Sequence, residues 1–557
     1  MSRYRWSNWM EEESGTPNGD QTFIGIDEKT DDPSLMQPGY YRAAQNVRVV
    51  NGNLGTRGGL TYAPAFNATS FGQIYGRGYY VDPATGTFWL MVGTKSGIWF
   101  VSDGNSPKFV NLPSGTVFTG PVDLVACYNI VLLFQGPGIT PLYWDGTWTH
   151  NFGSLPGPVG GKISIPDAWT GEFISDRIVV PYNIDTIAIS DIGSYYSYSN
   201  NFNNFNINQG EGDVLMRCME WYRGSALFFK FKSIYLAQNF SGDLTTMILN
   251  RIARGVGLCG RRAAILVGND FFFVSPGAVY RMNQIFEDTP EVRALPLSEP
   301  ILQTIKRINW PYASGVVVQN RNDRVYFAVP LDASTRNNAL LVWNIVRSAW
   351  ESIDTFPNSP SLGIDDIVEM PYNGQRRLFA IDYMAGAIYL MEDESNIDIL
   401  GPSNASTQIY TYFLSRGYAG PSIRSNYRHL KIGLASWSPD YSVNVYSSGV
   451  NEKQVVATNV TKPNTVYYGF GVANWNPTNV NNDWGTRDRK DYSVTLPVML
   501  GTKGICLDQK QDYVEGFPIR VPGKYAQIEL VNIQGGIELR DVLFESWENQ
   551  RADKRAV

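Results

Sequence analysis

One pattern recurs between residues 87 and 393 and limits what this chain can fold into. An alternating apolar strand is followed by a tight turn and then by a second strand that ends near Trp, Tyr or Leu. Alternation with period two, broken by short polar turns, is typical of antiparallel strands in a meander. The clearest copy is DRVYFAVPLDASTRNNALLVWNIVRSAWES, residues 323–352, and the other copies lie at 87–112, 129–152, 176–193, 225–240, 263–285 and 376–393.

The spacing of the copies favours one architecture. They recur at roughly 40 to 50 residues, which is the range of propeller blades. A meander of three or four strands cannot bury both of its faces alone, so we expect the copies to pack radially about an axis. A large β-sandwich with many hairpins is the alternative, but regular spacing favours a β-propeller. The predicted fold is therefore all-β, with a propeller of about six or seven blades over residues 61–400.

The segments on either side of the repeats differ from them. Residues 1–60 are predicted to be an extended N-terminal arm with one hairpin, because Asn51-Gly52 separates two short strand-like runs. After GPSNAST, residues 401–407, we expect strands separated by longer loops, including the Asn-rich loop 471–491. The expected strands are 427–437, 441–449, 491–500, 526–534 and 536–547. We predict a separate β-sandwich over residues 401–557.

The composition bears on partners and surfaces. Charged residues make up 18% of the chain, against about 25% in a typical soluble protein, so we expect large areas to be buried between copies. The net charge of −6 is spread without long runs of one sign, and no basic patch for tight nucleic-acid binding is visible.

One stretch, residues 299–310, is the best candidate for a short helix.

Cysteines and apolar runs bear on the compartment. The four cysteines, Cys127, Cys218, Cys259 and Cys506, lie far apart with no CxxC pair, so we expect buried thiols rather than disulfides or a zinc site. No secretory signal is evident, and apolar runs such as 130–134 are too short to span a bilayer. We expect a soluble protein made in a cytoplasm.

No catalytic motif stands out. The two histidines, His150 and His429, are expected at strand edges rather than as general bases. GVGLCG, residues 255–260, matches a dinucleotide fingerprint, but a strand-like stretch follows it where the fingerprint needs a helix. The turn at Asp145-Gly146 departs from the spacing of the Asp-box turns of sialidase propellers.

Carboxylates are the remaining candidates for chemistry. A glycosidase would use two or three inward carboxylates as acid and base, and the residues available for that role are Asp176, Asp185, Asp191, Glu211 and Asp213. Acidic residues are also common in turns for structural reasons, without any catalytic role. We therefore predict no catalytic residue, no cofactor and no metal, and that the protein is not an enzyme.

Four stretches resemble a known family. They are SLMQPGYYRAAQNVRVVNGNLGTRGG (34–59), FISDRIVVPYNIDTIAISDIGSYYSY (173–198), GDVLMRCMEWYRGSALFFKFKSIYLAQ (212–238) and GVGLCGRRAAILVGNDFFFVSPGAVYRM (255–282). In these stretches the chain resembles tail nozzle proteins of short-tailed bacteriophages, which are also called tail tube or packaged-DNA-stabilisation proteins.

The resemblance implies a structural role in the virion tail. Such nozzles are six-fold rings below the portal and adaptor, with a propeller in each subunit. They enclose the channel through which double-stranded DNA leaves, without specific binding, and they offer attachment surface to tail fibres or spikes. The family has no catalytic residues to transfer to this chain. Two alternatives stay open: a baseplate or tail hub protein of a long-tailed phage, and a glycan-binding or depolymerising propeller.

Overall fold

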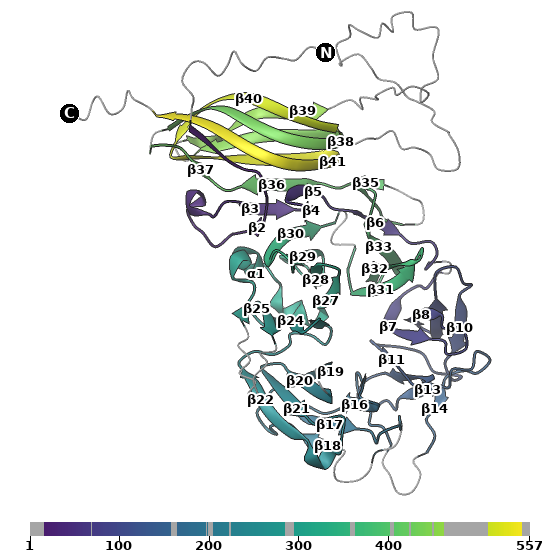
Figure 1. Ribbon diagram of the computed structural model, residues 1–557. Helices are drawn as coiled ribbons and strands as arrows, with labels where there is room; N and C mark the ends of the chain where they lie inside the picture. Colours follow the sequence, from purple (N-terminus) through teal and green to yellow (C-terminus); the bar gives the residue numbers. More distant parts are fainter. Residues whose placement is uncertain are drawn as a thin grey trace, which may run out of the picture.

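The computed structural model of the protein describes residues 16–67, 70–157, 164–195, 198, 204–221, 224–283, 295–356, 362–401, 406–422, 425–447, 450–461 and 511–548. Within these residues the chain forms a ring of small antiparallel sheets and, beside the ring, one large sheet of long strands (Figure 1). The predicted all-β class with a β-propeller is confirmed.

The ring contains seven blades, of which six are four-stranded and the last is six-stranded. The first three blades consist of β7 (Ile74–Val81), β8 (Phe88–Thr94), β9 (Gly97–Val101) and β10 (Lys108–Asn111); β11 (Asp123–Cys127), β12 (Ile130–Phe134), β13 (Leu142–Trp144) and β14 (Gly153–Ser154); and β15 (Glu172–Ile174), β16 (Arg177–Pro181), β17 (Thr186–Ile189) and β18 (Asn204–Asn206).

The next three blades consist of β19 (Leu215–Trp221), β20 (Ser225–Lys230), β21 (Ser233–Gln238) and β22 (Ile248–Arg254); β23 (Ala264–Val267), β24 (Asp270–Ser275), β25 (Ala278–Asn283) and β26 (Leu295–Pro296); and β27 (Val317–Arg321), β28 (Arg324–Val329), β29 (Ala339–Asn344) and β30 (Ala349–Thr355). The last blade contains β31 (Asp366–Tyr372), β32 (Gln375–Asp382), β33 (Ala387–Asp393), β6 (Gly59–Tyr62), β34 (Ile397–Ile399) and β35 (Ser406–Gln408). Each of the seven repeats found in the sequence falls in a different blade.

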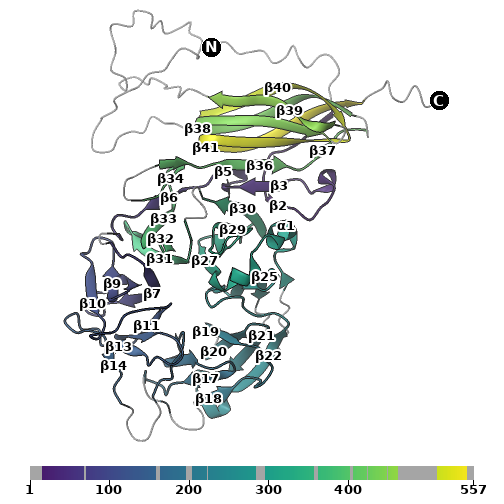
Figure 2. The same cartoon turned by 180° about the vertical axis from the view of Figure 1, so that it is seen from behind.

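Apolar side chains join each blade to the next. The middle strands β12 and β29 are buried at every position, because a neighbouring blade covers each face of the strand. Val368 and Phe379 of the last blade lie in one apolar cluster with Leu90 and Val92 of the first blade, and this contact closes the ring. The ring is seen from opposite sides in Figures 1 and 2.

An N-terminal strand completes the last blade. β6 lies between β33 and β34, so residues from the start of the chain pair with strands from beyond residue 386. Leu60 of β6 is buried in the cluster between the sixth and last blades. This arrangement ties the beginning of the ring to its end.

Helical structure is sparse among the described residues. The expected short helix is present between the fifth and sixth blades, as η5 (Glu299–Ile301) and α1 (Leu302–Lys306), and η6 (Trp310–Gly315) follows it. Two other 3-10 turns are η2 (Pro33–Leu35) and η4 (Leu244–Thr246).

The large sheet is built around two long strands, β38 (Ser425–Ser447) and β41 (Tyr525–Glu548), which pair along their whole length. The other strands of this sheet are β1 (Thr16–Asp20), β2 (Gly25–Ile26), β3 (Tyr40–Gln45), β4 (Val47–Val50), β5 (Asn53–Thr56), β36 (Thr411–Ser415), β37 (Tyr418–Ala419), β39 (Val450–Thr461) and β40 (Gln511–Gly523). Along the edge that faces away from β38, β41 pairs with β37, β36, β5 and β1 in turn.

Two details of the sequence interpretation differ from the structure. The stretches 427–437 and 441–447, expected in two separate strands, both lie on β38, and 526–534 and 536–547 both lie on β41. The expected strand 491–500 lies outside the described residues. Each long strand stays continuous because its partner offers hydrogen bonds along the same length.

The predicted hairpin at Asn51-Gly52 is present between β4 and β5, with φ of 52° and 89° at its two central residues.

Strand pairing crosses both expected domain boundaries. Residues 16–56, expected in an extended arm, form β1 to β5 of the large sheet, and β6 at residues 59–62 belongs to the propeller. The described residues after 425 share one hydrogen-bonded sheet with these N-terminal strands. The boundaries at 60 and 400 and the separate sandwich stay predictions, as does the loop 471–491, which lies outside the described residues.

Candidate functional site

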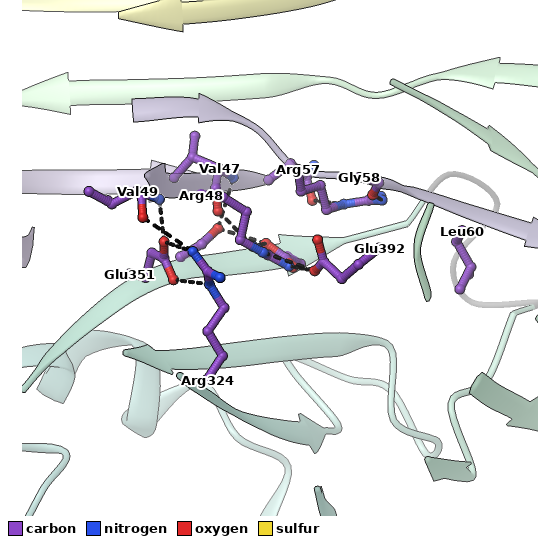
Figure 3. Close-up of polar contacts among 12 residues, drawn as sticks. Val47, Arg48, Val49, Arg57, Gly58, Leu60, Arg324, Glu351 and Glu392 are labelled. Carbon is purple, nitrogen blue, oxygen red and sulfur yellow. Dashed lines mark hydrogen bonds and ion pairs between the residues drawn. The ribbon is translucent and has the colours of Figure 1, made fainter. Parts of the chain in front are cut away.

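The junction between the N-terminal strands and the propeller is rich in buried charge (Figure 3). Arg48 of β4 donates hydrogen bonds to Asp354 of β30, with 3.1 Å between Nη1 and Oδ1, and to Glu392 of β33, with 2.9 Å between Nε and Oε1. Asp354 is fully buried and Arg48 is 5% exposed. One guanidinium therefore connects the N-terminal segment to two blades at once.

A second carboxylate at the junction is bound from two sides. The buried Glu351 of β30 accepts hydrogen bonds from the guanidinium of Arg324, at 2.7 and 2.9 Å, and from the backbone N–H of Val49. Arg324 Nη2 also donates to the carbonyl oxygen of Val49, at 3.2 Å (Figure 3). These side chains are fully engaged with one another, so the junction is a structural connection rather than a place for a ligand.

A cavity of about 1280 Å³ lies at the centre of the propeller. Its wall contains residues from the first strands of the first six blades and from loops, including one in the last blade. Its charged members include Arg77, Asp123, Glu172, Arg217 and Arg262. Central openings of propellers are common ligand sites, so this cavity is the candidate functional site.

The cavity is crossed by ion pairs between blades. Asp366 of β31 binds Arg77 of β7, with 2.9 Å between Oδ2 and Nε, and it also binds Arg262, which precedes β23. Arg262 Nη2 lies 3.8 Å from Asp123 Oδ1 of β11. Arg262 therefore links the fifth blade to the last blade and the second blade, which narrows the central opening.

We call the charged side chains around this cavity the cavity belt, which contains Arg77, Asp123, Glu172, Arg217, Arg261, Arg262 and Asp366. Contacts within the belt influence the pKa values of its carboxyls. Burial disfavours ionisation of Asp366, but Arg262 and Arg77 outweigh that effect and hold the pKa of its carboxyl below the usual value. At Glu172 burial has the larger effect and raises the pKa of the carboxyl, although Arg217 lies 2.8 Å away. Tyr383 Oη donates to Asp366 Oδ2 at 2.8 Å and completes the cluster.

The carboxylates that the sequence offered for hydrolysis lie outside the wall of the central cavity, and three of them bind neighbouring side chains. Asp185 binds the buried Lys230 at 2.8 Å, and Asp213 accepts from the backbone of Lys232 and the hydroxyl of Ser233. Glu211 lies 3.4 Å from Arg251. None of these three lines the central cavity.

The remaining members of that set are also away from the cavity wall. Asp176 occupies a turn with φ of 58°, and Asp191 lies in the segment after β17. None of these five carboxylates therefore lines the central cavity.

The other chemical candidates are accounted for within the fold. His150 Nδ1 lies 2.7 Å from Asp145 Oδ2 on an exposed turn, and His429 lies on β38. The stretch 255–260 connects β22 to β23, so a strand follows it rather than a helix, as predicted. Within the described residues no cluster of three or more His, Cys, Asp or Glu side chains is placed to hold a metal ion.

Three of the four cysteines lie in the described part of the chain. Cys127, Cys218 and Cys259 are buried and free, as predicted, and burial raises the pKa of the Cys127 and Cys259 thiols to about 12. Cys506 lies outside the described residues. No helix in the ranges that the structure describes is long and apolar enough to cross a membrane.

The central cavity was not identified from the sequence. Its residues come from every blade, so their spacing in the chain carries no motif. The only local signal is that charged residues such as Arg77, Glu172 and Arg217 lie on the first strands of blades. In the sequence, a charged side chain that faces the cavity cannot be distinguished from one that faces solvent. Register within a closed ring decides which of them face the axis.

Comparisons with known proteins bear on the fold. No family model and no curated protein matches this sequence. Among solved structures, the chain is similar to the extracellular domain of a hybrid two-component system from B. thetaiotaomicron, at 10% identity and a TM-score of 0.40, covering 62% of this chain and 45% of that one.

Two further structures show the same kind of likeness. The chain is similar to the β-propeller domain of Swd1 from Myceliophteria thermophila, at 11% identity and a TM-score of 0.36, covering 58% of this chain and 96% of that one. It is also similar to BamB from Moraxella catarrhalis, at 11% identity and a TM-score of 0.33, covering 67% of this chain and 99% of that one. At this level of identity the likeness concerns the propeller fold alone.

Proposed function

We propose that this chain is a structural virion protein, a subunit of the hexameric tail nozzle of a short-tailed bacteriophage. In this role it is made in the host cytoplasm and becomes part of the virion tail below the adaptor and portal ring. It extends their channel, retains the packaged genome, conducts double-stranded DNA at ejection and offers attachment surface for tail fibres or spikes.

The observation that carries this proposal is the position of the segment 34–59, which bears the resemblance to nozzle proteins. It supplies β3, β4 and β5 to the large sheet, and β6 of the last blade begins at its final residue. Its Arg48 and Arg57 form buried ion pairs with two strands of the propeller, at Asp354 of β30 and Asp398 of β34. The segment therefore connects the large sheet to the propeller (Figures 1 and 2).

A connection made by buried ion pairs suits the wall of a conduit. A subunit that retains a packed genome must resist outward force without its parts separating, and buried charge pairs resist separation because breaking one leaves an unpaired buried ion. The other three stretches that carry the resemblance form strands of the third, fourth and fifth blades.

The geometry of the cavity also bears on where DNA would pass. Arg262 binds side chains from opposite parts of the ring, so the propeller of one subunit does not offer an open bore. In the proposed assembly the conduit lies between copies, which requires each copy to present two different patches to its neighbours. The net charge of −6 agrees with a wall along which DNA slides without adhering.

The proposal is tested by electron microscopy of the purified protein, alone and after mixing with the adaptor ring of the same virion. We expect six-fold rings with a central bore that is neutral or acidic. Isolated protein is expected to be monomeric or weakly associated until the adaptor holds the copies together. A different symmetry, or a bore lined by Lys and Arg, contradicts the proposal.

A further inference from the structure

We propose that the central cavity of the propeller binds an acidic saccharide, and that Arg261 holds the carboxylate of that ligand. This binding function is separate from the proposed structural role and does not depend on assembly. It rests on an arginine without an ion-pair partner, on the exposed aromatic side chains around it, and on the size of the cavity.

Arg261 differs from the other arginines of the cavity belt. Arg77, Arg217 and Arg262 each bind a carboxylate, whereas Arg261 has no ion pair with any described residue. Its guanidinium carbon lies 5.1 Å from the ring centroid of Trp169, and both side chains line the cavity. A cation–π contact of this kind positions a guanidinium without neutralising it.

The surroundings of Arg261 favour an incoming anion. Burial lowers the pKa of Arg261 and the neighbouring Arg262 lowers it further, while Asp123 opposes the shift. The nearby carboxylate of Asp123 is already engaged, by the hydroxyl of Thr170 at 2.5 Å and by Arg262 at 3.8 Å. A ligand carboxylate would supply the missing partner, in the planar two-point geometry that a guanidinium offers.

The walls of the cavity suit a body with both polar and apolar faces. Trp169 is 38% exposed, Tyr312 is 48% exposed and Met384 is 67% exposed, although all three are large and line the cavity. Thr335 and Gln319 lie in the same wall and offer hydroxyl and amide groups. A sugar ring presents C–H faces to aromatic side chains and hydroxyls to polar ones, so it fits this mixture.

The size of the cavity indicates more than one ring. Its volume of about 1280 Å³ exceeds the roughly 300–1000 Å³ of sites that hold drug-sized molecules. A short oligosaccharide with one uronic acid is therefore the ligand class that we assign to it.

Calorimetry with the full chain tests this assignment. The probes are a trisaccharide with one uronic acid, the neutral trisaccharide of equal length, and the same neutral trisaccharide carrying one phosphate. We expect the uronic acid probe to bind at least about tenfold more tightly than the other two, as a charge-assisted pair implies. Absence of binding by the acidic probe at millimolar concentration, or equal or tighter binding of either other probe, overturns the proposal.

Variants connect the binding to the cavity. Arg261→Gln is expected to weaken binding of the uronic acid probe about tenfold. The control is Arg376→Gln on the last blade, where the Arg376 side chain is 79% exposed, and we expect it to leave the affinity for the probe unchanged. Should Arg261→Gln lower the melting temperature, Met384→Glu provides a second test, because an added negative charge at an exposed lining position repels the same ligand. Unchanged affinity in the folded variant overturns the role of Arg261.

Discussion

Arg57 and Asp398 form a buried bidentate ion pair, with 2.8 Å between Nη1 and Oδ1 and 2.7 Å between Nη2 and Oδ2. Arg57 follows β5 and Asp398 lies on β34, so the pair joins residues 341 positions apart in the chain. Arg57 is 2% exposed and Asp398 is fully buried. The backbone N–H of Leu60 donates to the same carboxylate at 2.8 Å, which fixes the start of β6.

We expect Asp398→Asn to lower the free energy of unfolding by about 3–5 kcal/mol, because it leaves a buried guanidinium without its counter-ion. Denaturant unfolding of the full chain measures this change. Asp332→Asn is the matched control, since Arg307 and Asp332 form the same bidentate pair, at 3.0 Å for both contacts, with side chains 50% and 60% exposed. The control is expected to lose less than about 1 kcal/mol, and equal losses at the two sites would show that burial is not the cause.

Gly257 is required by close packing rather than by its backbone angle. A Cβ atom at this position would lie 2.1 Å from the carbonyl oxygen of Lys230, whereas the positive φ in this stretch belongs to Gly255, at 78°. We expect Gly257→Ala to destabilise the fold by about 1–3 kcal/mol. Gly153→Ala, where nothing lies within 4 Å of the added atom, is expected to have little effect on the melting temperature.

The same stretch is expected to bind no nucleotide. Residues 255–260 lead into β23, so no helix N-terminus is available for a pyrophosphate. Equilibrium dialysis with NAD and ATP measures this directly. Tight binding that Gly257→Ala abolishes in a folded protein would contradict the structural interpretation of the stretch.

Leu60 is expected to be decisive for ring closure. It is 1% exposed and lies in the apolar cluster between the sixth and last blades, on the only N-terminal strand that the described propeller contains. We expect Leu60→Ala to cost about 2–5 kcal/mol and to increase cleavage by protease within the last blade. Leu35→Ala, at a position that is 72% exposed, serves as the control. Cleavage confined to other blades would contradict closure by β6.

The ion pair between Asp32 and Lys524 predicts a pH dependence. Lys524 and the hydrogen bonds from Ser34 lower the pKa of Asp32 to about 2, from 3.8. Because the folded-state pKa is the lower one, the stabilisation is complete above about pH 4 and is lost as the pH falls towards 2. Asp32→Asn retains the cap of η2 but loses the charge.

The difference in melting temperature between the parent protein and Asp32→Asn measures this effect. We expect a small difference at pH 7, since the two side chains are 31% and 46% exposed and solvent screens them. The difference should shrink between pH 4 and pH 2 and vanish below pH 2. A difference that stays constant from pH 7 to pH 2 would assign the effect to something other than the charge of Asp32.

The sequence by itself determined the local units of this protein. The seven repeats mark seven blades because a strand, a tight turn and a return strand are specified by neighbouring residues. The hairpin at Asn51-Gly52 and the short helix near residue 302 are local in the same sense, since turn residues and a few consecutive side chains define them.

Only the tertiary structure decided how the ends of the chain are used. Nothing near β6 in the sequence indicates that it completes a blade whose other strands lie between residues 366 and 408, and nothing near Arg57 indicates Asp398 as its partner. The central cavity is likewise a product of the closed ring, which brings Arg77, Asp366 and Arg262 to one axis. Such contacts depend on ring closure and strand register, which are set by packing between distant segments and leave no periodic signal in the chain.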